Sequence, residues 1–213
     1  MPPRIARLPR NERGYPIPWF VAVQDDGTRD FRIADGDRRI DAVQDDLCWV
    51  CGGRLGANLA FVIGPMCAVN RISAEPPGHY DCATYSARVC PFLATPQMVR
   101  REGGKPPGIT TLRDGPGHAI ERNPGVALVW SCRRYDVMVL DRADQSRFLC
   151  KMGEPTRVEF WCRGRRATRD EIMKSMESGL PILQQACQLD DNPAESLAFL
   201  ATQYQTALGL VPA

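Results

Sequence analysis

The sequence predicts an α+β protein: a treble-clef-like zinc module with a small antiparallel β-sheet and C-terminal helices. Six cysteine and histidine side chains fall within 43 consecutive residues of the N-terminal half. Short strand patterns flank that stretch on both sides, and helical patterns occupy the chain from residue 169 onward. With 213 residues, the chain can bury a sizeable core in one large or two small domains.

The composition is typical of a soluble globular protein. Hydrophobic residues make up 44% of the chain and charged residues 24%, and a net charge of +2 gives no global attraction to nucleic acid or membranes. The first ten residues lack the apolar core of a signal peptide, and no apolar run has the length of a membrane span. We therefore expect a cytoplasmic protein without a membrane partner, in which closely spaced cysteines indicate metal rather than disulfides.

The N-terminal segment predicts an arm followed by a β-hairpin. Residues 1–16 are rich in proline and arginine and are expected to be extended. Residues 17–24 and 30–34 have strand patterns, and the Asp-Gly pair at Asp26 and Gly27 supplies the positive φ of a hairpin turn.

A knuckle and a helix start together predict the zinc site. Cys48 and Cys51 lie in LCWVCGGRLG, where glycines let the backbone turn so that both sulfurs face one ion. After an apolar strand at 59–63, His79 and Cys82 open a helix at 80–90, and a spacing of three places both on one face of its first turn. A knuckle, a hairpin and two ligands on a helix start are the arrangement of a treble clef.

Six candidates compete for four positions on a structural zinc ion. We predict Cys48, Cys51, His79 and Cys82, because Cys90 would lie about two helical turns, roughly 12 Å, beyond Cys82. If the helix breaks early, Cys82 and Cys90 are the alternative pair. Cys67 is the alternative to His79 in a four-cysteine site, which could also hold an iron–sulfur cluster, although the close triplet of cysteines is absent. The alternative to a metal role for Cys67 and His79 is that they are ordinary core residues.

Residues 96–102 predict a short helix, and 103–125 a Gly- and Pro-rich linker or mobile loop. Strand patterns at 126–132, 136–140 with a continuation at 148–151, and 156–162 predict an antiparallel meander. We thus expect a hairpin and zinc module in 1–102, the linker, and a meander followed by helices in 126–213, packed as one unit. The remaining cysteines in apolar surroundings are predicted to be small core residues: Cys132, Cys150, Cys162 and Cys187.

Three helices are expected at the C-terminal end. Thr168 and Glu171 form a capping box for a helix from Arg169 to about Gly179. A second helix is expected from Leu180 to residue 187, and a third starts after Asn192 with an apolar stripe. If that stripe is exposed, it favours a protein partner or a homodimer.

The candidate ligands favour a binding protein over an enzyme. A catalytic zinc leaves one position open for water, whereas this cluster offers more ligands than needed. The alternative function is a treble-clef nuclease, which needs a histidine as general base. The residues available for such an active site are His79, Asp81, Asn70, Glu75 and His118. If His79 binds zinc, only His118 remains, in a glycine-rich loop. No P-loop, GxSxG or strand-to-helix GxGxxG motif is present.

Clustered arginines are the candidate nucleic-acid contacts. Arg133, Arg134, Arg165 and Arg166 lie at predicted strand ends, and Phe160 and Trp161 precede the second pair. Arginine with nearby aromatic rings can hold phosphates and stack on bases. Each pair by itself fits an ordinary solvated surface, but on one face the four would form a modest nucleic-acid footprint.

Several motifs resemble a family of small zinc-binding proteins found in bacteriophages and in bacteria carrying phage-like genes. They are LCWVCGGRLG, FVIGPMCAVNR, EPPGHYDC, CPFL, NPGVALVW and GRRATRDEI, and they cover almost the full chain. The resemblance implies a phage or mobile-element origin and an accessory role in the host cytoplasm. It implies no particular activity, so both nucleic acid and a host protein remain as expected partners.

Overall fold

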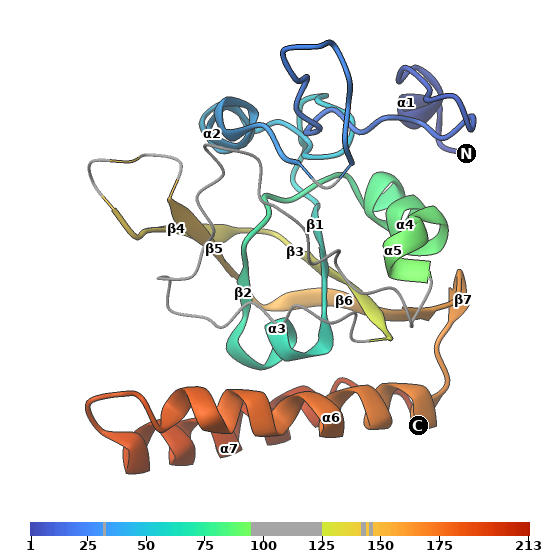
Figure 1. Ribbon diagram of the computed structural model, residues 1–213. Helices are drawn as coiled ribbons and strands as arrows, with labels where there is room; N and C mark the ends of the chain where they lie inside the picture. Colours follow the sequence, from blue (N-terminus) through green and yellow to red (C-terminus); the bar gives the residue numbers. More distant parts are fainter. Residues whose placement is uncertain (32, 95–124, 142–143, 145–146) are drawn as a thin grey trace. The chain divides into compact units, whose positions relative to one another are not determined.

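The computed structural model of the chain describes residues 1–31, 33–94, 125–141, 144 and 147–213 (Figure 1). Contacts divide the chain into two compact units, and the backbone passes between them several times. The first comprises Met1–Val62, Ser73–Ser86 and Val129–Arg157, and the second Ile63–Ile72, Ala87–Leu128 and Val158–Ala213. The predicted helix at 96–102, almost all of the predicted linker and His118 lie outside the described residues, so the predicted domain division stays a prediction.

Among the described residues, short helices and two strands are mixed in the first part of the chain, five strands follow, and two long helices end it. In order, the elements are α1 Pro3–Ala6, α2 Gly36–Gln44, β1 Leu59–Ile63, α3 Pro65–Asn70, β2 Ile72–Ser73, α4 Tyr80–Val89, α5 Pro91–Ala94, β3 Ala127–Cys132, β4 Tyr135–Val139, β5 Phe148–Met152, β6 Pro155–Cys162, β7 Arg165–Arg166, α6 Arg169–Cys187 and α7 Pro193–Leu208. None of these described helices combines the length and the hydropathy needed to cross a membrane.

The strands form two small sheets, in the orders β1-β3-β6-β7 and β2-β5-β4. Antiparallel pairing places Tyr135 opposite Met152 and Val139 opposite Phe148 in the β4–β5 pair. The mixed helices and small antiparallel sheets agree with the predicted α+β class. The predicted meander is wrong in one respect, because β3 and β4 follow each other in sequence but belong to different sheets. All six residues of β3 are buried, whereas β4 is largely exposed, so the two strands have different surroundings.

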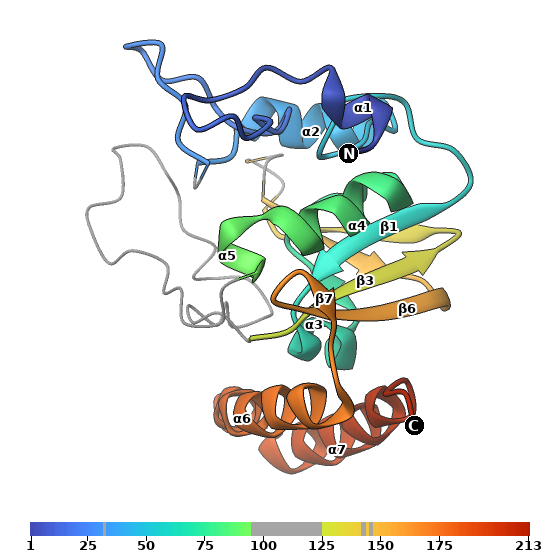
Figure 2. The ribbon, with the colours of Figure 1, turned by 90° about the vertical axis from the view of Figure 1, so that its right-hand side faces the viewer.

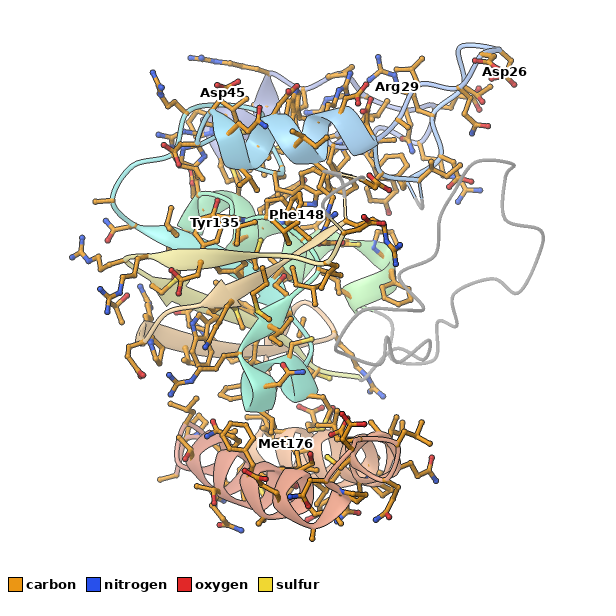
Figure 3. The ribbon with its side chains drawn as sticks, turned by 90° about the vertical axis from the view of Figure 1, so that its left-hand side faces the viewer. Asp26, Arg29, Asp45, Tyr135, Phe148 and Met176 are labelled. Carbon is orange, nitrogen blue, oxygen red and sulfur yellow. The ribbon has the colours of Figure 1, made fainter. Side chains whose placement is uncertain are left out.

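The predicted N-terminal hairpin forms as two irregular arms rather than two strands. A single antiparallel bridge joins Val21 to Ala34, and the Ala22 amide donates to the Ile33 carbonyl at 3.0 Å. The turn uses Gly27 at φ +79°, as the Asp-Gly signal predicts. Asp26 stabilises the turn by accepting hydrogen bonds from the Thr28 amide and hydroxyl, and it lies at the tip of the loop (Figure 3).

The C-terminal helices form an antiparallel pair within the second unit (Figures 1 and 2). The capping box at Thr168 and Glu171 starts α6 as predicted. The predicted break near Gly179 is wrong, because α6 runs unbroken to Cys187 with Pro181 inside it. A Cβ on Gly179 would lie 2.6 Å from Met66 Cγ on α3, so this glycine permits close helix packing rather than ending a helix. Both α6 and α7 pack against α3, and Met176 is fully buried.

Gly179→Ala tests this close approach. We expect the variant to lower the free energy of unfolding by up to about 2 kcal/mol, because a helix-propensity gain of about 1 kcal/mol offsets only part of an overpacking cost of about 1–3 kcal/mol. Urea denaturation measures the change. Gly36→Ala, at the start of α2, is the matched control, since no atom of the described residues lies within 4 Å of the place a Cβ would take there. Equal effects in both variants would contradict the packing explanation.

Candidate metal centre

The first two metal-capable residues lie on a tight knuckle. The Cys48 amide donates to the Gly53 carbonyl and the Gly52 amide to the Cys48 carbonyl, each at 2.8 Å. Gly52 has a φ of +69°, which favours glycine, and a Cβ there would lie 2.7 Å from the Trp19 ring. Both the backbone conformation and the close contact with Trp19 therefore require glycine at this position. This turn brings the Cys51 amide to 3.5 Å from Cys48 Sγ.

The other two residues come from the start of α4. Reciprocal backbone hydrogen bonds at 2.9 and 2.8 Å join Ala60 of β1 to Gly78 and so fix the segment that precedes the helix. The His79 carbonyl accepts from the Ala83 amide at 2.9 Å, which places His79 at the helix entrance and Cys82 in its first turn. The His79 amide in turn lies 3.3 Å from Cys48 Sγ. The helix start therefore contacts the knuckle directly.

The ligand atoms of Cys48, Cys51, His79 and Cys82 all lie within 4.8 Å of one another. His79 Nδ1 is 3.4 Å from Cys51 Sγ and 4.0 Å from Cys82 Sγ. His79 Nε2 is 2.9 Å from the Arg54 carbonyl oxygen, which can only accept, so Nε2 carries the proton and Nδ1 keeps its lone pair for an ion. The four residues could hold a metal ion, and three sulfurs with one nitrogen are a set that zinc accepts.

The pKa values of the three thiols depend on one another because their sulfurs lie close together. Hydrogen bonds from the thiols of Cys48 and Cys82 lower the pKa of Cys51 to about 2. The hydrogen bond between Cys48 and Cys51 raises the pKa of Cys48, and hydrogen bonds to both neighbours, with burial, raise the pKa of Cys82. Without an ion, only one sulfur is therefore a thiolate at neutral pH. A divalent cation bound by the group would lower the pKa values of Cys48 and Cys82 and allow all three sulfurs to ionise.

The N-terminal arm packs against this group instead of extending into solvent, so the predicted extended conformation of residues 1–16 is wrong for its first part. Residues 3–6 form the single turn α1, and Ile5 is only 1% exposed. Ile5 shares a buried cluster with Cys48, Val50 and Cys82, and Leu8 packs at its edge. Burying an isoleucine side chain is worth about 1.5–3 kcal/mol, which favours the packed arm over an extended one.

The arm also brings arginines to the metal centre that the sequence analysis did not single out. Arg4, Arg7 and Arg54 line a hollow of about 320 Å³ together with Cys51 and His79. The available signal was the i, i+3 spacing of Arg4 with Arg7 and of Ile5 with Leu8, which is a single amphipathic turn. The spacing indicates a site only once the turn packs on the knuckle, because that packing buries Ile5 and places Arg4 and Arg7 beside Cys51 and His79.

The remaining cysteines take no part in the group. Cys67 lies on α3 and Cys90 between α4 and α5, and neither joins the four residues above. Cys132, Cys150 and Cys162 are buried, as predicted for small core residues, while Cys187 is half-buried. Burial raises the pKa of Cys150 to about 12, so this thiol is neutral.

The pieces of the alternative nuclease site have other roles or fall outside the described residues. His79 belongs to the metal-capable group, and its second nitrogen is bound to Arg54. Asp81 forms an ion pair with Arg4 at 3.2 Å, and the Asn70 side chain accepts from the Ile72 amide at 3.0 Å. Glu75 is exposed, and His118 lies outside the described part of the chain.

The four predicted nucleic-acid arginines fall into two pairs with different surroundings. Arg165 donates two hydrogen bonds to Glu171 at 2.9 and 2.8 Å, and this contact is the main cause of the lowered Glu171 pKa of about 2. Arg166 pairs with the buried carboxylate of Glu159 and lies over the Trp161 ring at 4.3 Å. Both arginines thus stabilise the second unit.

The other pair, Arg133 and Arg134, is exposed in the connection between β3 and β4. These residues belong to the first unit, whereas Arg165 and Arg166 belong to the second. That all four share one face stays a prediction.

The chain matches no protein-family model, no curated protein and no solved structure.

The ligand set predicts metal content directly. We expect one zinc ion per chain. The ion should be retained in Cys67→Ser and in Cys90→Ser but lost in Cys82→Ser, because Cys82 is the one of these three cysteines that belongs to the four-residue group. Elemental analysis of the purified variants measures the stoichiometry, and circular dichroism reports whether each variant stays folded. Loss of zinc from Cys67→Ser or Cys90→Ser would overturn the set.

Metal binding should also depend on pH in a defined direction. Cys48 and Cys82 have raised pKa values and Cys51 a lowered one, so loading at pH 7 should release about two protons, and affinity should rise with pH near neutrality. Calorimetric titration in buffers of different ionisation enthalpy counts the protons. Cys67→Ser is the control and should release the same number; a heat that does not depend on the buffer would contradict the prediction.

Proposed function

We propose that the chain is a zinc-stabilised, non-enzymatic nucleic-acid-binding protein whose metal module is of the treble-clef type. The observation that carries the proposal is the four-residue group itself. Two residues come from a knuckle and two from a helix start, and β1 lies between them in sequence. Four protein ligands complete the tetrahedral coordination of zinc and leave no position for a water or a substrate.

The surroundings of the group support a structural role for the ion. Cys48 and Cys82 are fully buried, and the Arg54 carbonyl occupies the second nitrogen of His79. A general base needs a free nitrogen with access to water, so His79 is not suited to nuclease chemistry. The nuclease alternative then depends on His118 alone.

Nucleic acid is proposed as the partner because some exposed arginines form no ion pair within the described residues. Arg133 and Arg134 are exposed, and within the described residues neither guanidinium forms an ion pair. Paired arginines with free guanidinium groups suit phosphate oxygens, which accept two hydrogen bonds from one side chain. A phage or mobile-element origin remains a prediction that accords with such a role.

A protein partner is the second candidate, and one surface favours it. Val137 and Val139 lie on the same side of β4, the last strand of its sheet, and are 41% and 60% exposed. An exposed strand edge with apolar side chains can pair with another chain, including a second copy. Nucleic acid is preferred because unpaired arginines also lie beside the metal centre, at Arg7 and Arg54.

Salt dependence tests nucleic-acid binding. The zinc-loaded protein should bind single-stranded or duplex oligonucleotides at 50 mM salt and lose affinity steeply toward 200 mM, because binding to phosphates releases counterions. Arg133→Gln with Arg134→Gln should weaken binding several-fold, whereas Arg165→Gln should lower stability and leave affinity unchanged. Fluorescence anisotropy measures affinity and thermal denaturation measures stability.

Two outcomes would contradict the proposal. Affinity that does not change with salt would exclude phosphate contacts as its source. Metal-dependent cleavage of the oligonucleotide that disappears in His118→Ala, while the fold and the zinc are kept, would establish the nuclease instead.

A further inference from the structure

Beside the metal centre, the first unit contains a hollow whose charge the zinc site does not explain. It has a volume of about 320 Å³, and its walls include the three arginines Arg4, Arg7 and Arg54 with Cys51 and His79. Two of the arginines come from the N-terminal arm and one from the knuckle, so the hollow exists only because α1 packs on the metal module.

Well-defined contacts hold the walls in place. Ile5 is buried against Cys48 and Cys82, which fixes α1 and directs its flanking residues Arg4 and Arg7 outward. Arg4 is held by its ion pair with Asp81 at 3.2 Å. The backbone of Arg54 is held by its bridge to Leu47 and by the hydrogen bond from its carbonyl to His79.

The positive charge around the hollow exceeds the negative charge that a zinc-loaded group and Asp81 would supply. A zinc ion with three thiolates and one neutral histidine carries a single negative charge, and Asp81 adds another. Three guanidinium groups outnumber these two. Within the described residues, Arg7 and Arg54 form no ion pair, and both are exposed. An anion is therefore the complementary ligand.

We infer that this hollow binds one phosphate group of a nucleic-acid backbone, with Arg7 and Arg54 as its direct contacts and Arg4 as a fixed positive neighbour. The nucleic-acid source of the phosphate rests on the proposed function, whereas the anion site rests on the hollow itself. Guanidinium groups bind phosphate through paired hydrogen bonds, and the zinc-stapled backbone holds one of them on a rigid turn. A metal ion held by Cys48, Cys51, His79 and Cys82 would keep this turn rigid.

The test uses the zinc-loaded full chain and the double variant Arg7→Gln with Arg54→Gln. Each lost phosphate contact should weaken oligonucleotide binding about tenfold and lower the slope of log affinity against log salt by about one. Zinc content and melting temperature should not change. Arg29→Gln is the matched control, because Arg29 is an exposed arginine of the same unit that lies on the hairpin loop and not in the hollow (Figure 3).

Inorganic phosphate tests the site independently of nucleic acid. In wild type, its addition at constant ionic strength should shift the amide resonances of Gly53 and Arg54, and the double variant should abolish the shifts. Phosphate-induced shifts without oligonucleotide binding would support the anion site and remove nucleic acid as its source, so the proposed function would fail alone. Oligonucleotide binding that the double variant leaves intact would overturn the inference and spare the function. Zinc loss from the double variant would overturn it too, because the arginines would then serve the metal.

Discussion

Mutual proximity of three sulfurs and one imidazole nitrogen ties the knuckle at Cys48 and Cys51 to the start of α4. These segments are 28 residues apart at their nearest ligands, Cys51 and His79. Structural zinc contributes about 10–16 kcal/mol in small zinc-binding peptides, which is as large as the total stability of a typical domain, about 5–15 kcal/mol. The pKa values of Cys48 and Cys82 are raised and that of Cys51 is lowered, so a shared cation would be needed for all three sulfurs to be thiolates together near neutral pH. A metal ion bound by these four residues would therefore make a major contribution to the stability of the first unit.

Other features of the first unit follow from that tie. Ile5 finds a buried site only because Cys48 and Cys82 are held together, and its burial converts the start of a proline- and arginine-rich arm into a fixed turn. The same packing gathers Arg4, Arg7 and Arg54 around one hollow. A metal ion held by the four residues would supply a rigid backbone on which these three positive charges are positioned.

The second unit shows how differently the same residue type can be used. Arg165 completes the capping region of α6 through Glu171, and Arg166 neutralises the buried Glu159 while covering Trp161. These cations are occupied by their own chain, whereas Arg7, Arg54, Arg133 and Arg134 form no ion pair within the described residues. An arginine cluster in a sequence thus says little about binding until the positions of the carboxylates are known.

The sequence by itself determined what depends on local geometry. The knuckle, the strand at 59–63, the helix start with His79 and Cys82, and the capping box at Thr168 follow from spacing, because turns and first helical turns place side chains a few residues apart predictably. Spacing also predicted that the knuckle and the helix start meet, but this contact spans 28 residues and belongs to the tertiary structure. Only tertiary structure decided what depends on neighbours distant in sequence. α6 continues through Gly179, which packs closely on Met66 of α3; β3 and β4 pair with different partners, which splits the expected meander; and the arm folds with Ile5 buried. Long-range packing outweighs local propensities of about 1 kcal/mol per residue, so a glycine, a strand order or an arm cannot be assigned from the sequence alone.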